Sequence, residues 1–525
     1  MKKLLSLALC FAFVVSVALM GGCTVPAATT APAAADGAAA PAEPAAEAAA
    51  PVEPTDDVIT VAIDTEPAHL ALSISADYIT VWCTKNINDY LVQYNPKMEL
   101  VNSLAKRLEM IDGTTYEFEL QPGVLFHNGR EVKAEDVKYS LDYIVDPNTG
   151  SSTASYFTTL DRVEVTGDYT GTIYLTEPYA PFISRLTMVP IIPKECEATI
   201  KTAPVGCGPF KFQAWNKDQD LQLVRFDDYW REGYPKAAGV TIKFIKEYNT
   251  IHNAFLAGEV DVLLWSSFTD IAVWDGAEGV HAQATDLYDA FVLVYNTDVK
   301  PFDDPRVRKA IALALNKQEL IDLTSQGYGK VLDQPVYPDT YFYNQDAAYT
   351  QDIEAAKALL AEAGFPDGFK CSLKVPNTVQ EGGCGDVIQN QLKAIGIECE
   401  LEKMEVSVFI DAVWGKKSFE MCVTGDGSEG EPDTWLSRWI KTGAGNNVGN
   451  YSNAEMDKLI AEGTAATTDE ARKAIYDKLF LMMRDEQPIT YLFGGYLYSG
   501  VRDGVEGLQG YANWWFDFDG MYKTH

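Results

Sequence analysis

Short segments in which apolar and polar residues alternate recur from about residue 58 onward. Three of them are TYEFEL at 115–120, TGTIYL at 170–175 and FVLVYN at 291–296. Alternation with a period of two places the apolar side chains on one face of an extended chain, so these segments predict half-buried β-strands. The runs VITVAI at 58–63 and FEMCVT at 419–424 extend the same prediction along the chain.

Longer segments between the strands carry apolar residues at helical spacing. In the segment 303–323, Asp304 suits the N-cap of a helix and Pro305 suits its first position. Two further helices are predicted within 351–365 and 385–397, each with a glycine next to its last residue. The alternation of such helices with strands predicts an α/β fold.

The segment from Cys371 to Val423 reads strand, helix, strand, helix, strand, which predicts a mainly parallel sheet. Ligands of such sheets bind at loops beyond the carboxyl ends of strands. The loop GDGSEGEPD at 425–433 follows the last strand and contains no lysine or arginine. Its carboxylates repel one another unless a positive group meets them, so we expect a binding loop here. These carboxylates belong to Asp426, Glu429, Glu431 and Asp433.

The first residues predict export and membrane attachment. Lys2 and Lys3 precede an apolar run that is typical of a signal peptide, which we place at 1–22. The sequence LMGGC that ends at Cys23 resembles a bacterial lipobox, so we expect Cys23 to carry a lipid; an ordinary secretory signal is the alternative. Residues 23–56 are almost all Ala, Pro, Thr and Glu, and predict a disordered spacer.

The overall charge and the cysteines narrow the function classes. The formal net charge of −33 argues against nucleic acid and anionic lipid headgroups as partners. Of nine cysteines, Cys10 leaves with the signal peptide and Cys23 is predicted to be lipidated. Seven remain, so at least one thiol stays unpaired, and no C-x-x-C pair indicates zinc. The five histidines lack metal-ligand spacing and no catalytic motif is present, so we expect neither an enzyme, nor a metal site, nor a cofactor.

Several motifs occur together in the order of a known family. The block LVQYNPKMELVNSLAKRLEMIDGTTYEFELQPGVLFHNGREVKAEDVKYSLDYI at 91–144 is followed by APVGCGPFKFQAW at 203–215 and LAGEVDVL at 256–263. VYNTDVKPFDDPRVRKAIALALNKQELID then follows at 294–322. Through these motifs the chain resembles the family 5 extracellular solute-binding proteins of bacterial ABC importers, which include dipeptide-, oligopeptide- and nickel-binding proteins.

The resemblance implies a two-lobed α/β fold of the large periplasmic-binding-protein class, with mixed sheets flanked by helices. Lobe I would comprise 57–290 with 489–525, and lobe II would comprise 291–488. The ligand would lie in the cleft between the lobes. Together with the signal peptide and the lipobox, the resemblance implies an extracytoplasmic monomer, anchored by lipid to the membrane, that delivers a peptide-like solute to ABC permease subunits.

The resemblance also assigns residues to the site. Thr424-Gly425-Asp426 matches a triplet whose aspartate holds the ligand's α-ammonium in the dipeptide-binding branch. The segment VPNTVQEGGCGD at 375–386 has no arginine or lysine where that branch supplies an arginine. A longer peptide, a peptide derivative or another cationic amine therefore fits better than a free dipeptide.

Four other residues are candidate ligand contacts. Tyr295 and Asn296, together with Thr297, would face the cleft or else pin the hinge. Trp435 would line the cleft, although its spacing from Trp439 also fits a core helix. Trp82 would line the cleft from lobe I.

Three residues near these candidates are expected to lie outside the contacts with ligand. His127 is expected to be structural. Glu429 and Glu431 are expected to be solvated charges at the rim of the site.

Other functions stay open at this point. A metal chelate or an oligosaccharide is the alternative ligand. The alternative role is a receptor-coupled sensor that reports a solute without importing it.

Overall fold

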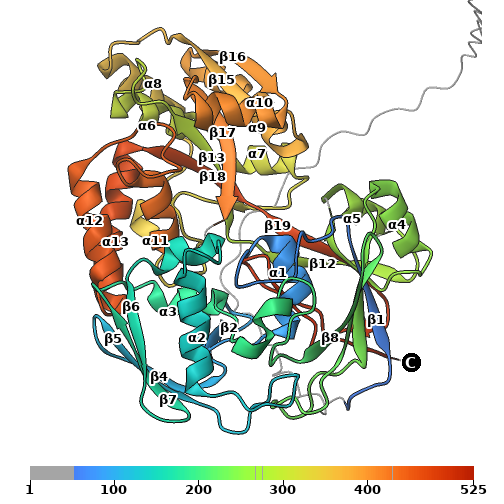
Figure 1. Ribbon diagram of the computed structural model, residues 1–525. Coiled ribbons are helices and arrows are strands. Elements are labelled where there is room, and N and C mark those ends of the chain that lie inside the picture. The colour runs from blue at the N-terminus through green and yellow to red at the C-terminus, as the bar shows by residue number, and fades with distance from the viewer. Residues whose placement is uncertain (1–52, 267, 275, 428–429, 525) are drawn as a thin grey trace, which may run out of the picture. The chain divides into compact units, whose positions relative to one another are not determined.

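The computed structural model describes residues 53–266, 268–274, 276–427 and 430–524. The predicted signal peptide, Cys23, most of the predicted spacer and Glu429 lie outside the described residues. The fold of the described chain is built on two large mixed sheets and a smaller antiparallel one (Figure 1).

The first large sheet has β1 near its middle, parallel to both of its neighbours, β10 and β11. The remaining neighbours in this sheet are antiparallel. Ile59 and Val61 of β1, and Val240 and Ile242 of β10, are fully buried. In spatial order the strands are β12 (Val280–Asp286), β19 (Tyr496–Arg502), β11 (Val262–Ser266), β1 (Val58–Ile63), β10 (Gly239–Phe244), β9 (Asp220–Arg225) and β8 (Phe210–Asn216).

The second large sheet contains the predicted strand–helix–strand–helix–strand segment. Strand β15 is parallel to β16 and β17, which confirms that prediction, whereas β13 is antiparallel to its neighbours. In spatial order the strands are β14 (Lys330–Val331), β18 (Ile489–Gly494), β13 (Asp289–Tyr295), β17 (Met421–Gly427), β15 (Lys370–Pro376) and β16 (Glu398–Met404). The helices of this part are α6 (Pro305–Ala314), α7 (Lys317–Thr324), α8 (Ile353–Glu362), α9 (Val379–Leu392) and α10 (Val406–Ile410).

The helix expected over 303–323 is divided into α6 and α7. Asp304 caps α6 by accepting a hydrogen bond from Arg306 N, and Pro305 is its first residue, as predicted. Leu315 and Asn316 are extended, and Asn316 caps α7 by accepting from Glu319 N. Asparagine is a strong N-cap residue, so it begins a second helix where the apolar spacing alone suggests a continuous one.

A four-stranded antiparallel sheet completes the first part of the chain, with α2 (Ala134–Val145) packed on it (Figure 1). Its strands, in spatial order, are β4 (Ala105–Asp112), β5 (Thr115–Leu120), β7 (Thr170–Leu175) and β6 (Leu160–Val165). The other helices are α1 (Tyr78–Thr84), α3 (Phe182–Arg185), α4 (Tyr248–Leu256), α5 (Phe268–Trp274), α11 (Pro432–Trp435), α12 (Ala454–Ala465) and α13 (Asp469–Glu486). Short strand pairs are β2 (Val92–Tyr94) with β3 (Leu100–Asn102), β20 (Val505–Glu506) with β23 (Tyr522–Lys523), and β21 (Gln509–Gly510) with β22 (Phe516–Asp517).

The chain passes between the two large sheets at closely placed points. Strand β12 of the first sheet leads through Leu287 and Tyr288 into β13 of the second. Strand β18 of the second sheet leads through Gly495 back into β19 of the first. Gly495 N donates to the Asp289 side chain at 3.0 Å, so the two connections are hydrogen-bonded to each other.

None of the helices within the described ranges has the length and apolar character needed to cross a membrane.

Candidate functional site

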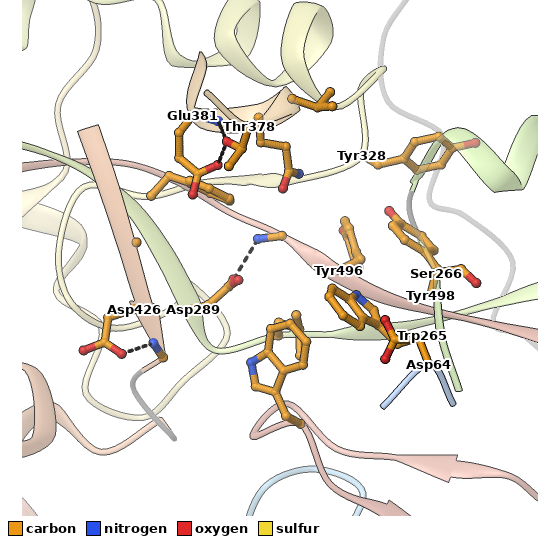
Figure 2. A pocket seen from close by; sticks show the side chains of 18 of the residues that line it. Asp64, Trp265, Ser266, Asp289, Tyr328, Thr378, Glu381, Asp426, Tyr496 and Tyr498 are labelled. Atoms are coloured by element: carbon orange, nitrogen blue, oxygen red, sulfur yellow. Dashed lines mark hydrogen bonds between the residues drawn. The ribbon is translucent and has the colours of Figure 1, made fainter. Parts of the chain in front are cut away.

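A cavity of about 550 Å³ adjoins these connections and is lined by residues of both large sheets (Figure 2). Its volume is in the range of small-molecule sites in proteins. The first sheet contributes Trp265 and Ser266 from β11 and Tyr496 and Tyr498 from β19. The second contributes Asp289, Ala290 and Phe291 from β13 and Gly425, Asp426 and Gly427 from β17. Thr378, Val379, Gln380 and Glu381 at the start of α9, together with Asp64, Lys246, Tyr248, Ile251, His252, Leu287, Tyr328, Gly495 and Trp514, complete the lining.

One wall of the cavity is aromatic. The rings of Trp265 and Trp514 meet edge to face with centroids 6.3 Å apart. Trp82, the candidate from lobe I, is only 1% exposed and lies behind these rings, with its Nε1 donating to the Trp514 carbonyl at 2.6 Å. The structure therefore places Trp82 as a support of the aromatic wall rather than in the lining.

The charged groups of the lining are mostly acidic. Asp64, Asp289, Glu381 and Asp426 supply carboxylates. The ammonium of Lys246 lies 2.6 Å from Asp218, which is outside the lining. Burial lowers the pKa of His252, so the imidazole favours its neutral form. Among the described residues the lining is thus rich in negative charge.

Asp426 lies in the lining, but on β17, which continues to Gly427, rather than in a loop that begins at Gly425. Its Oδ2 accepts hydrogen bonds from Arg438 Nη2 at 2.6 Å, Trp439 Nε1 at 2.9 Å and Asn446 Nδ2 at 3.1 Å. The loop 425–433 itself has no lysine or arginine, but Arg438, twelve residues later on the helical turn Leu436–Ile440, supplies a counter-charge to Asp426 from within the protein.

Asp289 was missed by the sequence analysis. It begins β13, and Figure 2 shows its carboxylate nearer the middle of the cavity than that of Asp426. Oδ1 accepts from Gly495 N at 3.0 Å. Burial raises the pKa of Asp289, and the charge of Asp426 adds to the rise. The sequence feature that could have identified Asp289 is its position as an acidic residue just before the predicted strand at 291–296.

Three predicted ligand residues lie outside the cavity lining. Tyr295 is fully buried, and its hydroxyl pairs with Thr490 Oγ1 at 2.7 Å. Asn296 Nδ2 donates to the Phe419 carbonyl at 2.9 Å. The physical reason is the direction of β13, which starts at the cavity with Asp289 and ends with Tyr295 about 20 Å away.

Trp435 is the third of these residues. It is 1% exposed and stacks on Trp439 with ring centroids 5.1 Å apart. Both rings belong to a hydrophobic core that packs on the second large sheet. This is the core helix that their spacing left open as the alternative to a ligand contact. The structure therefore does not bring Tyr295, Asn296 or Trp435 together with Asp426.

Two further expectations have clear outcomes. Glu431 is not a solvated rim charge: it is buried and forms an ion pair with Arg472 of α13. His127 is structural, as predicted, with Nε2 donating to the Gly208 carbonyl at 2.9 Å and Nδ1 accepting from Gly206 N at 3.3 Å. Burial lowers the pKa of His127 to about 4.

Within the described part of the chain, no group of three or more His, Cys, Asp or Glu side chains is arranged to hold a metal ion.

Comparison with known proteins gives consistent matches. The family described as bacterial extracellular solute-binding proteins, family 5, matches residues 99–447. The glutathione-binding protein GsiB of Pectobacterium atrosepticum is 29% identical over 415 residues, which cover 76% of this chain and 80% of the relative. The dipeptide-binding protein of Escherichia coli is 26% identical over 447 residues, covering 78% and 83%.

A solved structure agrees with these matches. HbpA2 from Haemophilus parasuis superposes with a TM-score of 0.80 at 25% identity, covering 89% of this chain and 100% of that structure. The periplasmic binding protein DppA from Helicobacter pylori also superposes, with a TM-score of 0.71 at 25% identity, covering 90% of this chain and 98% of that structure, so the periplasmic-binding-protein fold expected from the sequence is confirmed.

Proposed function

Because the chain belongs to the bacterial extracellular solute-binding proteins of family 5, we propose that its ligand is a peptide or peptide-like solute that carries a cationic amine. The protein is a substrate-binding component of an ABC importer and not an enzyme, as its family and relatives show. The identity of the solute is the open question, and the composition of the cavity bears on it directly.

The acidic lining of the cavity carries the proposal. Four carboxylates face a space whose one lysine is paired with Asp218, and whose histidine favours the neutral form. An anionic ligand would be repelled there, whereas an ammonium group removed from water gains charge-assisted hydrogen bonds. A cationic amine is the ligand group that this lining suits best.

Asp426 and Asp289 are the proposed partners of the ammonium. Asp426 is already bonded by Arg438, but the side chains of this pair are 26% and 36% exposed, so the pair is weak and open to exchange. Desolvation of the partly buried Asp289 raises its pKa, and the charge of Asp426 adds to the rise. A cation between the two carboxylates would give Asp426 another positive partner and would also stabilise the charged form of Asp289.

The segment at the start of α9 supports a peptide-like ligand longer than a free dipeptide. Thr378 caps α9, and its hydroxyl also donates to the Glu381 carboxylate (Figure 2). The segment supplies Gln380 and Glu381 to the cavity, with no cation to meet a nearby carboxylate. A ligand whose carboxylate is distant, masked or missing fits this wall.

The relatives favour the same class. One of them is named as a glutathione-binding protein and another as a dipeptide-binding protein. Both names describe small peptides with a free amino group.

We further propose that the two lobes predicted from the sequence, 57–290 with 489–525 and 291–488, close on the ligand. The position of the cavity beside Leu287, Asp289 and Gly495 supports a hinge there, because these residues lie where the chain passes between the sheets. Closure would exclude water from the ammonium and strengthen its bonds.

The family acts outside the cytoplasm, and for this chain we propose attachment through a lipid on Cys23. The support is the apolar run followed by LMGGC. Cys23→Ser should move the protein from the membrane fraction to the soluble fraction, and equal retention of both forms would contradict the proposal. We expect the released protein to be a monomer that delivers its ligand to the permease.

The ligand proposal is tested by mass spectrometry of solutes that co-purify with the protein, followed by calorimetry with each solute found. An amine-bearing peptide or peptide derivative that binds in the micromolar range or tighter supports it. A metal chelate or an oligosaccharide as the bound solute would overturn it.

A further inference from the structure

Two cysteines of the second large sheet lie side by side. Strands β15 and β16 are parallel, and their register places Cys371 directly opposite Cys399. The two sulfur atoms are 3.3 Å apart. Both side chains are nearly buried, with exposed fractions of 6% for Cys371 and 8% for Cys399.

The backbone at this place suits a disulfide. Neighbouring strands of a sheet lie about 4.8 Å apart. Cysteines joined by a disulfide have Cα atoms about 4.4–6.8 Å apart. The side chains of residues opposite each other in a parallel pair project on the same side of the sheet, so the two sulfurs can reach bonding distance by small side-chain rotations.

A cavity gives reagents access to this pair. It has a volume of about 450 Å³ and is lined by both cysteines, Lys370, Ser372 and three glutamates, Glu398, Glu400 and Glu420. Lys370 pairs with Glu398 at 2.9 Å, and Ser372 N and Oγ both donate to Glu420. The remaining charge around the thiols is therefore negative.

The two thiols are unequal. The hydrogen bond between the sulfurs lowers the pKa of Cys399 and raises the pKa of Cys371. A thiolate, not a thiol, attacks a disulfide. The pKa directions favour Cys399 as the sulfur that reacts first and Cys371 as the one that resolves the mixed disulfide, and variants test this order.

We propose that Cys371 and Cys399 form a disulfide that links β15 to β16 in the protein outside the cytoplasm. The bond forms by exchange with a small-molecule or protein disulfide, RSSR. The Cys399 thiolate attacks one sulfur of RSSR and releases RS⁻, which leaves Cys399 joined to the other R–S group. The Cys371 thiolate then attacks the Cys399 sulfur and releases the second RS⁻. The two thiol protons end on the two RSH products, so atoms and electrons balance.

The surroundings of this pair set it apart from the other cysteines. Cys83, Cys207 and Cys422 are fully buried, and burial raises the pKa of each thiol. Cys384 is buried against Thr324 in the helix α9. One disulfide among seven cysteines leaves five thiols, which agrees with the odd number in the sequence.

The location of the bond relates it to the ligand cavity. Strand β15 continues through Asn377 into Thr378, the N-cap of α9, and Glu381 of that helix lines the cavity. A covalent link between β15 and β16 therefore fixes the strand that leads directly into one wall of the site.

The test uses the protein isolated without reductant, with free thiols blocked by an alkylating agent at lysis. A second sample is first incubated with cystamine. Non-reducing peptide mapping by mass spectrometry should find the peptides of Cys371 and Cys399 joined and two hydrogens lighter than their sum. If both cysteines remain alkylated separately after prolonged incubation with cystamine, the proposal is overturned.

Variants test the order of attack. The variant Cys371→Ser should trap a mixed disulfide on Cys399. In the variant Cys399→Ser, the reagent should modify the remaining Cys371 at least tenfold more slowly than it modifies Cys399 in the first variant. Cys196→Ser is the control, because Cys196 is a partly exposed single thiol beside Asn128 and its loss should leave the cross-link unchanged. Because the peptide map of the unaltered protein needs no variant, a variant that fails to fold does not decide the outcome.

The charge of the reagent provides an independent test. Cystamine is cationic and oxidised glutathione is anionic, so the glutamates should favour cystamine by about tenfold at low salt, and less as salt is added. The ratio is compared with that at Cys196 in the same sample. An equal preference for cystamine at Cys196 and at the pair Cys371 and Cys399 would show that reagents do not reach the pair through the acidic cavity, and would overturn the proposed route of access.

Discussion

The acidic loop after β17 is flanked by two ion pairs of very different character. Asp426 pairs with Arg438 at the cavity, where the side chains are 26% and 36% exposed. Glu431 pairs with Arg472 in the interior, where the corresponding values are 10% and 6%. The two carboxylates are five positions apart in the sequence, yet water reaches one and barely reaches the other. Exposure, rather than residue type, therefore separates a carboxylate available to a ligand from one that holds the fold.

The largest expected effect is on stability at the buried pair. Glu431→Gln should lower the free energy of unfolding by about 3–5 kcal/mol, because it leaves the buried guanidinium of Arg472 with only the exposed Asp469, 3.7 Å away, as an acidic partner. Denaturant unfolding measures this. The matched control is Asp426→Asn, for which we expect a loss of about 1 kcal/mol or less, as for other exposed pairs. Equal losses of unfolding free energy in the two variants would contradict the distinction between the buried pair and the exposed pair.

The second effect is on binding at the exposed pair. Asp426→Asn should weaken binding of an amine-bearing ligand by about thirtyfold, since loss of one partner of a desolvated charge pair costs about 2 kcal/mol or more. Glu431→Gln, studied where it is folded, should bind nearly as the unaltered protein does. Titration calorimetry on both variants decides whether the roles are divided as proposed.

The third effect concerns pH. Burial raises the pKa of Asp289, so this carboxylate takes up a proton at a higher pH than an ordinary aspartate. Affinity for the amine should therefore be full at neutral pH and fall as the pH drops through that raised pKa. Asp289→Asn should bind more weakly at neutral pH and lose this part of the pH dependence. An unchanged pH profile in the variant would exclude Asp289 from the site.

The smallest effect is expected at Arg438. Its guanidinium competes with the ligand's ammonium for Asp426, so Arg438→Met should tighten binding about two- to fivefold, which corresponds to the modest energy of an exposed pair. Competition measurements at fixed ionic strength can resolve this change. A large loss of affinity would instead show that Arg438 contacts the ligand itself.

The sequence predicted the fold better than the site. Periodicity identified the strands and the parallel arrangement around β15, because each of these depends on neighbouring residues. The division at Asn316 was missed because capping overrides an apolar stripe. Tyr295 was chosen from the family resemblance, and the hydrophobic pattern of β13 could not show that the opposite end of the strand, at Asp289, meets the cavity.

The partners of the acidic loop were beyond sequence reasoning for a different reason. Arg438 returns to Asp426 through a helical turn, and Arg472 reaches Glu431 from a helix about forty residues later. Charge counting within the loop found no cation, and only the tertiary fold supplies one. Such pairings depend on packing over long stretches of chain, which local patterns do not encode.

In the proposed complex, a carboxylate of this cavity holds the ligand's amine. Calorimetry on four combinations tests it: the unaltered protein and Asp426→Asn, each with a peptide ligand and with its N-acetylated form. Either change alone should weaken binding by about thirtyfold, and the two together should cost little more than one, because each removes half of the same interaction. If the N-acetylated peptide binds the unaltered protein as tightly as the free amine does, the claim is contradicted.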